Sequence, residues 1–341
     1  MAYERYLQGY SFMEILGEGA FGRVYKATHT LTHTEVAVKV MKIDKTVAGL
    51  IEREVEALKK VSHPNLAQLY QACSVSGRCF LVQEYCAGKS LRTIISSRRE
   101  PVIPDDLAAS IFAQLTEAVR FLHERLIFHR DIKPDNIILN RSGVVKLIDL
   151  GLCAMPADGN SLLTEYNGTR KYSAPEVLQR RPFLGGPADI WSLGITLYNI
   201  VTALHPFNAE GKGLAYNAKH KPLVIPEAVS PGCREVLNWI LKKDPQLRPS
   251  AENILLMEWV HKENIPTAGH EARAQPLVKK AVKRVSKASG LSKEAVKERV
   301  IQWDFTYDTA SYLIALQELQ GAKKEKSSSS WITQFLCGRG C

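Results

Sequence analysis

The order of apolar and polar positions divides the chain into a strand-rich part and a helix-rich part. Residues 12–85 contain short apolar runs typical of strands, of which Val36–Val40 and Phe80–Val82 are the clearest. One stretch of helical spacing, from about Val47 to Lys60, interrupts these strands. Between residues 104 and 262 apolar side chains recur mainly at helical intervals. The pattern therefore predicts an α+β protein in which a small sheet with one helix precedes a helical region.

A further helical region follows, separated from the first by polar residues. Residues 263–276 include Pro266 and Gly269 and are predicted to form a linker. Residues 277–320 show three short helical patterns, which cover Leu277–Lys287, Ser292–Trp303 and Asp308–Leu319. The third pattern has one apolar stripe, formed by Ala310, Leu313, Leu316 and Leu319.

Three helices around one small core are marginally stable alone, so we expect residues 277–320 to dock on the rest of the chain. Residues 321–341 are rich in Lys and Ser and are expected to be a disordered tail. Cys337 and Cys341 in this tail could be lipidated, although they fit no prenylation motif.

Length and composition are those of a globular protein. A chain of 341 residues, 45% of them hydrophobic, can bury one large core or two smaller ones. Residues 1–10 lack the apolar run of a signal peptide, and no later run reaches membrane-spanning length. These features favour the cytoplasm or the nucleus. The seven cysteines are scattered and show no zinc-ligand spacing, so we interpret them as reduced thiols.

The net charge of +10 raises the question of an anionic partner. Much of the excess lies in one segment, residues 272–299, rather than across a whole binding face. A solvated helix face accounts for such a segment. We therefore expect neither nucleic acid nor a membrane as a partner.

A glycine-rich turn lies between the first two predicted strands, at Gly17-Glu18-Gly19-Ala20-Phe21-Gly22. Glycines let backbone amides approach phosphate oxygens, although the same pattern also occurs in plain hairpin turns. A later strand carries Ala37-Val38-Lys39, which suits an ammonium group aimed at phosphates. A buried lysine is costly without a partner, and Glu54 on the predicted helix is the expected one.

The segment His129-Arg130-Asp131-Ile132-Lys133-Pro134-Asp135-Asn136 resembles the catalytic loop of the eukaryotic protein kinases. The resemblance implies that Asp131 orients the substrate hydroxyl and accepts its proton, that Lys133 contacts the transferring phosphate, and that Asn136 binds magnesium. These side chains suit the reaction, because phosphoryl transfer depends on positioning and charge neutralisation. Lysine at position 133 is the form found in serine/threonine kinases.

Other segments of the same family follow in the family's order. Asp149-Leu150-Gly151 is similar to the magnesium-binding Asp-Phe-Gly segment, with Leu150 in place of phenylalanine. Ala174-Pro175-Glu176, Asp189-Ile190-Trp191 and Arg248 match later segments, and Thr169 joins the catalytic set. The resemblance covers residues 10–262 and implies a two-lobed fold, with a small β-rich N-lobe and a helical C-lobe.

The resemblance also implies ATP and Mg2+ as cofactors and phosphorylation of Ser and Thr hydroxyls in protein substrates. Asp149 and Asn136 are the implied metal ligands. ATP is expected between the lobes, with backbone hydrogen bonds from Glu84 and Cys86. The full set implied around ATP is Leu16, Gly17, Glu18, Gly19, Ala20, Phe21, Gly22, Val24, Ala37, Lys39, Glu84, Cys86 and Ile138.

Within the family, the motifs are most similar to those of the AMP-activated kinase, the microtubule-affinity-regulating kinases and the sperm motility kinases. The usual activating phosphothreonine of that group aligns with Glu165, and Thr164 is the nearest hydroxyl. We expect Glu165, a permanently acidic residue, to pair with Arg130, while Ala154 replaces the second basic residue of the phosphate pocket. A solvated glutamate on a mobile loop remains the alternative.

Substrate selection is also expected to differ from that of relatives that require arginine before the target residue. Those kinases use a set of acidic residues, of which only Asp135 remains here. Ser90 and Asn199 occupy the other positions. A demand for basic substrates is therefore doubtful.

Residues 277–320 are similar in position and pattern to the ubiquitin-associated domain of the same group. Ser289-Gly290-Leu291 stands in place of its Met-Gly-Tyr loop and removes an apolar ubiquitin contact. We expect docking on the kinase domain rather than ubiquitin binding. A catalytically idle kinase-like scaffold and a ubiquitin-binding adaptor remain the alternatives to an active kinase.

Overall fold

The structure is a computed structural model that describes residues 3–19, 22–97, 103–209, 211, 213–261, 277–302 and 305–324, with only the backbone of 321–324. Contacts between residues divide the chain into two compact units. The sheet unit contains the described parts of residues 3–62, 67–86 and 277–324. The helical unit contains the described parts of residues 63–66 and 87–261.

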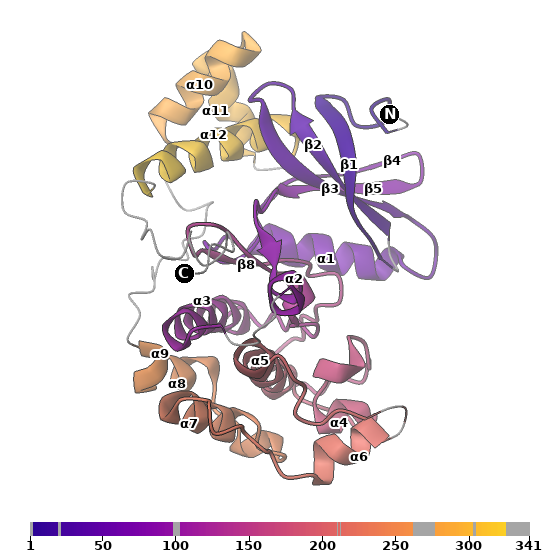
Figure 1. Ribbon diagram of the computed structural model, residues 1–341. Helices are drawn as coiled ribbons and strands as arrows, with labels where there is room; N and C mark the ends of the chain where they lie inside the picture. Colours follow the sequence, from indigo (N-terminus) through magenta and orange to yellow (C-terminus); the bar gives the residue numbers. More distant parts are fainter. Residues whose placement is uncertain are drawn as a thin grey trace. The chain divides into compact units, whose positions relative to one another are not determined.

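The sheet unit is built on an antiparallel sheet with the strand order β1-β2-β3-β5-β4 (Figure 1). Its strands are β1 (Tyr10–Gly19), β2 (Gly22–His29), β3 (Thr34–Lys42), β4 (Leu69–Val75) and β5 (Arg78–Glu84). The two clearest apolar runs of the sequence form neighbouring inner strands, with Val38 opposite Val82. Both valines are fully buried, as expected of branched residues in the middle of a sheet.

Helix α1 (Ala48–Lys60) follows β3 and contacts β4. It begins one residue later than the spacing predicts, because Val47 is its N-cap residue. Asp44 accepts hydrogen bonds from the backbone N–H groups of Thr46 and Val47 and shapes the turn before the helix. The buried residues of α1 share one face and are Ile51, Glu54, Ala57 and Leu58.

The sheet unit also contains α10 (Lys279–Ser289), α11 (Lys293–Ile301) and α12 (Tyr307–Lys324). Gly290 ends α10 in the left-handed conformation that glycine adopts without strain. Ser292 caps α11 by accepting a hydrogen bond from the N–H group of Ala295. Local stop and start signals therefore separate these helices.

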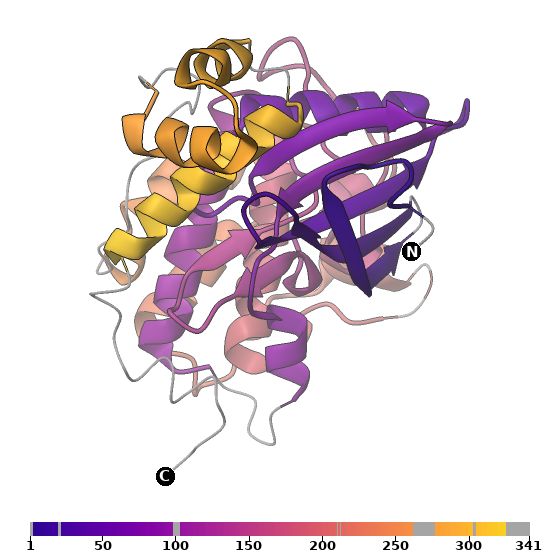
Figure 2. The same ribbon diagram turned by 90° about the horizontal axis from the view of Figure 1, so that it is seen from above.

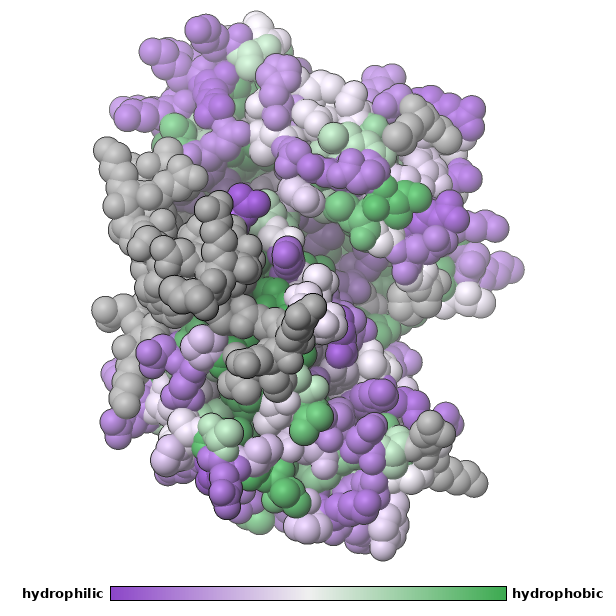
Figure 3. All heavy atoms as spheres, viewed as in Figure 1, coloured by the Kyte–Doolittle hydropathy of each residue, from purple (hydrophilic) through white to green (hydrophobic). Residues whose placement is uncertain are grey.

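A single hydrophobic core joins α10, α11 and α12 to the sheet. It contains Val282 of α10, Val300 of α11 and Leu313 of α12, together with Tyr10 and Tyr70 of the strands. Figures 1 and 2 show α12 (yellow) alongside the sheet. The outer surface over α10 and α11 is mostly hydrophilic in Figure 3, which agrees with the exposed basic residues there. The helices thus bury their apolar faces against one another and the strands.

Polar contacts add to this interface. The Oγ atom of Ser311 lies 3.3 Å from Nε2 of the buried His29 ring. The same ring lies with its centroid 4.6 Å from that of Tyr307. Thr34 donates a hydrogen bond from its hydroxyl to Glu318. Polar side chains of α12 therefore contact polar side chains of β2 and β3 across the interface.

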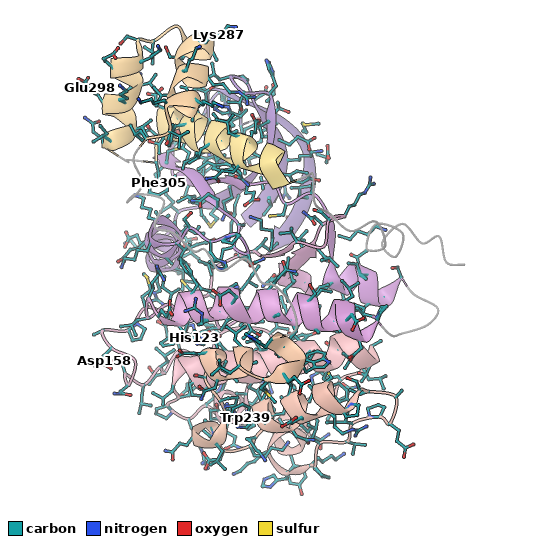
Figure 4. The ribbon with its side chains drawn as sticks, turned by 90° about the vertical axis from the view of Figure 1, so that its left-hand side faces the viewer. His123, Asp158, Trp239, Lys287, Glu298 and Phe305 are labelled. Carbon is teal, nitrogen blue, oxygen red and sulfur yellow. The ribbon has the colours of Figure 1, made fainter. Side chains whose placement is uncertain are left out.

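The segment before α12 also contacts β4. The carbonyl of Phe305 accepts a hydrogen bond from the backbone N–H of Ala72 at 3.0 Å. The Phe305 ring is buried, and Nζ of Lys59 lies 5.7 Å from its centroid (Figure 4). Farther along α12, Gln317 accepts a hydrogen bond from the hydroxyl of Tyr70.

Two features of this region extend beyond what the sequence indicated. Helix α12 continues to Lys324, past the predicted boundary at 320, because the residues after Gly321 favour helix. Burial on α12 is also wider than the predicted apolar stripe, since it includes Tyr312, Ile314 and Ala315. The helix packs on α10, α11 and a strand, so more than one stripe is covered.

The helical unit contains a small antiparallel sheet and eight described helices. The strands are β6 (Lys89–Ser90), β7 (Ile137–Leu139) and β8 (Val145–Leu147). The helices are α2 (Leu91–Ser96), α3 (Asp105–His123), α4 (Pro175–Leu178), α5 (Gly185–Thr202), α6 (Gly213–His220), α7 (Pro231–Ile240), α8 (Ala251–Leu255) and α9 (Glu258–His261). Short 3-10 turns cover Pro134–Asn136, Arg170–Tyr172 and Pro245–Leu247.

Helices α3 and α5 form the centre of the helical unit and contact each other. Nearly all residues of α5 are buried, as is typical of a helix surrounded by other elements. The predicted α+β class, with a β-rich first part, a helical second part and further helices at the end, is confirmed. Among the described residues, no helix is long and apolar enough to span a membrane.

Several sequence expectations lie outside the described residues. They concern Ala20 and Phe21 of the glycine-rich turn, Trp303, the linker at 263–276, and the tail after residue 324 with Cys337 and Cys341.

Candidate active site

A buried aspartate on α5 fixes the backbone of the loop that carries Asp131. The carboxylate of Asp189 accepts hydrogen bonds from the N–H groups of His129 and Arg130, each at 2.8 Å. Nε2 of His123 lies 3.0 Å from the same carboxylate (Figure 4). These contacts hold Arg130 at a φ of 63°, in the left-handed region that is unfavourable for residues with a Cβ atom. The loop is thus anchored firmly behind Asp131.

Asp131, Lys133 and Thr169 form one hydrogen-bonded cluster. Nζ of Lys133 lies 2.6 Å from Oδ2 of Asp131 and 2.7 Å from Oγ1 of Thr169. The backbone N–H of Thr169 donates to Oδ1 of Asp131 at 2.9 Å. Gly168, with a φ of 105°, allows this approach, because a Cβ there would lie 2.4 Å from the carbonyl oxygen of Arg130. The structure therefore brings together the three predicted catalytic residues of this unit.

Asn136 joins the same cluster. Its Nδ2 atom donates to the carbonyl of Asp131 at 2.9 Å and to Oδ2 of Asp131 at 3.2 Å. Its backbone carbonyl accepts the N–H of Ile148 at 2.9 Å, which ties the loop to the end of β8. Asp149 comes next in sequence, has a φ of 65°, and accepts a hydrogen bond from the N–H of Gly151 at 3.2 Å. A backbone hydrogen bond therefore links the two segments that carry the predicted metal ligands.

The donor chemistry of Asn136 and Asp149 fits Mg2+. An amide oxygen and a carboxylate are hard ligands, and Mg2+ commonly takes only one or two protein ligands besides water and substrate phosphates. Within the described ranges, no group of three or more His, Cys, Asp or Glu side chains could hold a metal by itself.

In the sheet unit, Lys39 of β3 and Glu54 of α1 form a buried ion pair. Nζ of Lys39 lies 2.7 Å from Oε1 of Glu54, and the two side chains are 11% and 3% exposed. Removing one partner from such a pair would leave an uncompensated buried charge, which is strongly unfavourable. The helix therefore holds the lysine side chain in a defined position on the sheet.

The glycines of the β1–β2 turn differ in what they do. A Cβ at Gly22 would lie 2.1 Å from the carbonyl oxygen of Val40, so this glycine is required for the strands to pack. A Cβ at Gly17 or Gly19 would meet no protein atom within 4 Å. These two glycines are not needed for packing, and they leave backbone accessible on the exposed end of β1.

The remaining predicted nucleotide residues are divided between the units. Leu16 and Glu18 are exposed on β1, and Glu18 accepts a hydrogen bond from Nε of Arg23 at 2.9 Å. Val24 of β2 and Ala37 of β3 are partly buried. Ile138 lies in β7 of the helical unit.

Glu84 and Cys86 end the strand-rich part of the chain. The N–H of Glu84 donates to the carbonyl of Gln68 at 2.9 Å, so this donor is already used within the sheet. The thiol of Cys86 lies 3.8 Å from the carbonyl oxygen of Glu84. The Glu84 N–H is thus used within the sheet, and the backbone contacts of Glu84 and Cys86 with adenine remain a prediction.

Arg130 connects the catalytic loop to the segment that contains Glu165. Its guanidinium NH2 lies 3.1 Å from Oε2 of Glu165, and its Nε donates to the carbonyl of Leu152 at 2.6 Å. The Arg130 side chain is 3% exposed, whereas that of Glu165 is 48% exposed. Ala154 is buried and exchanges backbone hydrogen bonds with Phe128. The glutamate thus pairs with Arg130 while nearly half of its side chain is exposed.

A second Arg–Glu pair lies deeper in the unit. The guanidinium of Arg248 contacts both carboxylate oxygens of Glu176, at 2.7 and 2.9 Å. It also donates to the carbonyls of Pro187, Lys242 and Lys243. This pair fastens α4 to the loop before α8.

The sequence did not indicate one further network close to Asp131. Arg92 of α2 contacts Asp135 and Tyr172, and Tyr172 in turn donates to Oδ1 of Asn199 at 2.8 Å. Arg92 belongs to no recognisable motif, so only the three-dimensional arrangement identifies it.

A β-rich unit with a buried Lys–Glu pair, followed by a helical unit with an Asp, Lys and Asn on one loop, defines the class of the eukaryotic protein kinases. Residues 10–260 match the family described as the protein kinase domain. The chain therefore belongs to the protein kinase family, as the motifs indicated, and the two-lobed fold expected of it is confirmed.

Several curated proteins are similar over most of this chain. Sperm motility kinase 2B of Mus musculus is 31% identical over 322 residues, which cover 93% of this chain and 65% of the mouse protein. Maternal embryonic leucine zipper kinase of Xenopus tropicalis is 31% identical over 320 residues, or 92% of this chain and 48% of the frog protein. CBL-interacting serine/threonine-protein kinase 16 of Arabidopsis thaliana is 36% identical over 273 residues, covering 76% and 58%. The chain thus spans about half to two thirds of the length of these relatives.

Proposed function

We propose that this chain transfers the γ-phosphoryl group of ATP, with magnesium, to Ser or Thr hydroxyls of protein substrates. The observation that carries the proposal is the cluster of Asp131, Lys133, Thr169 and Asn136, joined by hydrogen bonds of 2.6–3.2 Å. Membership of the protein kinase family and similarity to named serine/threonine kinases support it.

In the proposed reaction, Asp131 orients the acceptor hydroxyl and takes its proton as the oxygen attacks phosphorus. The new O–P bond forms while the bond from the γ-phosphorus to the bridging oxygen breaks, and ADP leaves with the electron pair. Lys133 stabilises the charge that develops on the transferring group. Its contacts to Asp131 and Thr169 keep the ammonium group beside the acceptor position.

Lys39, held by Glu54, is proposed to bind phosphate oxygens of ATP, and Gly17 and Gly19 to bring backbone N–H groups close to them. Asn136 and Asp149 would hold Mg2+, which neutralises phosphate charge when bound. The hard-oxygen character of these two ligands and their shared anchor at the end of β8 support this assignment.

A phosphotransfer assay tests the proposal, with radiolabelled ATP, magnesium and a generic protein substrate. Asp131→Asn should lower turnover by about 10²-fold or more, because a general base is lost, while nucleotide affinity stays near that of the wild type. Asp158→Asn is a matched control, since this carboxylate is exposed and its contacts to Asn160 and Ser161 only shape a local turn (Figure 4). An inactive wild type that still binds ATP would instead identify a kinase-like scaffold.

The metal assignment has its own test. Asp149→Asn should weaken binding of the magnesium–nucleotide complex, because a charged oxygen ligand of a hard cation is removed. Nucleotide affinity can be measured by calorimetry with and without magnesium. Equal loss of affinity in both conditions, or none in either, would contradict this role.

We propose further that Glu165 stands permanently in place of an activating phosphate. Its 3.1 Å contact with Arg130 supports this, because Arg130 directly precedes Asp131 in the catalytic loop. A carboxylate suits a site with one basic partner better than a dianionic phosphate does. The unmodified protein should then be partly active without an upstream kinase.

The three C-terminal helices are proposed to work as an intramolecular partner of the kinase domain rather than as a ubiquitin-binding module. The shared core and the Phe305, Ser311 and Gln317 contacts support this assignment. A ubiquitin titration followed by NMR would test it, since chemical-shift changes on α10 and α11 would favour the adaptor function instead.

A further inference from the structure

Arg92 and Asp135 form a two-point ion pair on the surface of the helical unit. Nε of Arg92 lies 3.4 and 3.3 Å from the two carboxylate oxygens of Asp135, and NH2 lies 3.2 Å from Oδ2. The guanidinium thus makes long contacts with both carboxylate oxygens, as its planar fork of donors allows. Both side chains are 46% exposed, so a bound peptide can reach them.

Buried residues beneath the surface hold the Arg92 side chain in this position. NH2 of Arg92 also donates to the hydroxyl of Tyr172 at 2.6 Å, and that hydroxyl donates to Oδ1 of Asn199 at 2.8 Å. Tyr172 and Asn199 are buried. A side chain fixed by a buried chain of hydrogen bonds loses less entropy on pairing than a freely rotating surface arginine.

This network is tied to Asp131 on two sides. Asp135 directly precedes Asn136, whose side chain donates to the carbonyl of Asp131 at 2.9 Å. Tyr172 follows Thr169 in the same 3-10 turn region, and the Thr169 N–H lies 2.9 Å from the Asp131 carboxylate. An extended peptide advances about 3.3 Å per residue, so a substrate whose acceptor lies at Asp131 can place a residue a few positions away beside this network.

Neither Asp135 nor Asn199 offers the unpaired negative charge that would attract basic peptides. Asp135 is already paired, and Asn199 is neutral and buried. Arg170 and Lys171, which follow Thr169, are both exposed. A peptide approaching Asp131 along this surface therefore meets a paired carboxylate and additional positive charge.

We propose that Arg92 is a specificity-determining residue. By neutralising Asp135, it makes the surface near the acceptor site disfavour basic substrate residues and favour acidic ones. The inference rests on the proposed kinase function and specifies its substrate class. Discrimination comes from the repulsion of a substrate arginine as well as from attraction of a substrate carboxylate.

The test compares kcat/KM for three matched peptides that share one acceptor serine. At the positions flanking the acceptor they carry alanine, glutamate or arginine, and a positional-scanning library first identifies the responsive position. The wild type should use the glutamate peptide better than the arginine peptide, by roughly two- to fivefold for each half-exposed ion contact. Phosphorylation of the alanine peptide shows that the kinase function itself is intact.

Arg92→Ala exposes the Asp135 carboxylate and should raise the arginine-to-glutamate ratio of kcat/KM by about two- to fivefold. Adding Asp135→Asn should remove that gain, whereas Asp135→Asn alone should change the ratio much less, because Asp135 is already neutralised in the wild type. Lys221→Ala, which removes one exposed positive charge from the loop after α6, is the charge-matched control and should leave the ratio unchanged.

Arg92→Gln covers the case in which the alanine variant fails to fold, since glutamine can still donate to the Tyr172 hydroxyl. A wild type that prefers the arginine peptide would overturn the proposal. An unchanged ratio in folded Arg92 variants that still phosphorylate the alanine peptide would overturn it as well. Failure to phosphorylate any peptide would instead count against the proposed kinase function.

Discussion

The interface between α12 and the sheet is mainly apolar and buried, whereas the contact between Arg130 and Glu165 is ionic and half exposed. The first gains stability from removing large side chains such as Tyr10 and Tyr70 from water, which works in any ionic condition. The second depends on one ion pair that water and salt can screen. The apolar contact of α12 therefore suits a permanent attachment. The ionic contact of Glu165 suits a segment that must change its conformation.

The largest effect should come from removing the apolar contact completely. Deleting residues 277–341 uncovers Tyr10 and Tyr70, which alone should cost about 3–6 kcal/mol of unfolding free energy, and it also removes Phe305 from β4. Thermal melting followed by circular dichroism measures the loss. A matched truncation after residue 324, which keeps α12, should melt like the full chain. Equal stability of both truncations would show that the helices are an independent module.

A point substitution sharpens the same comparison. Phe305→Ala removes a buried ring from the contact with β4 and should destabilise the protein by about 3–5 kcal/mol. Ile301→Ala is a suitable control, because Ile301 is an exposed apolar residue only four positions earlier. Urea unfolding should give a lower midpoint for Phe305→Ala only, and similar midpoints for the two variants would contradict a packed interface.

Acid should weaken the α12 interface through His29. Burial, with a smaller contribution from the charge of His33, lowers the pKa of His29 from 6.5 to about 4. The folded form therefore keeps the ring neutral where the unfolded chain already binds a proton, so stability is full above pH 6.5 and falls as the pH drops toward 4. The loss at the acid end is about 3 kcal/mol for this residue.

The measurement is urea unfolding of the wild type and of His29→Gln from pH 7 to pH 4. The glutamine variant should lose less stability than the wild type over this interval. The comparison between variants is necessary because burial also lowers the pKa of His63 in the helical unit to about 4. Parallel pH profiles would mean that His29 is not responsible.

The ionic contact should give the smallest change in stability and a clear change in activity. Glu165→Ala should cost only about 0.2–1 kcal/mol of stability, the range of a half-exposed ion pair. Turnover should fall several fold with nucleotide affinity unchanged, because the ion pair only shifts the segment that contains Glu165 toward its active conformation and does not lock it there. Dephosphorylated wild type must be active for this explanation to hold. Activity that follows phosphate on Thr164 would make the threonine the switch.

Local patterns predicted much of the fold and the site. The apolar runs at β3 and β5, the Ser292 cap and the Lys39–Glu54 pair depend on residues close in sequence or on a strong periodic signal. The catalytic loop is recognisable because its functional side chains lie within a few positions of one another.

Other features depend on contacts that no local pattern contains. Arg92 and Asp135 are 43 residues apart, and each has an ordinary surface residue type for its element. The extent of burial on α12 was underestimated because the helix contacts both α10 and β4. The strand pairing that uses the Glu84 N–H likewise follows from its tertiary neighbour Gln68. Such features are set by tertiary packing, which overrides local preference.

The hydrogen bond from Ala72 to the carbonyl of Phe305 has a consequence for solubility. Strand β4 is last in the order of the five-stranded sheet, so among the described residues one side of it has no neighbouring strand. Open edges recruit strands from other molecules and begin aggregation unless something covers them. Phe305 and the following helix occupy part of that edge. Phe305 and the C-terminal helices therefore leave less of this edge open to pairing with a strand of another molecule.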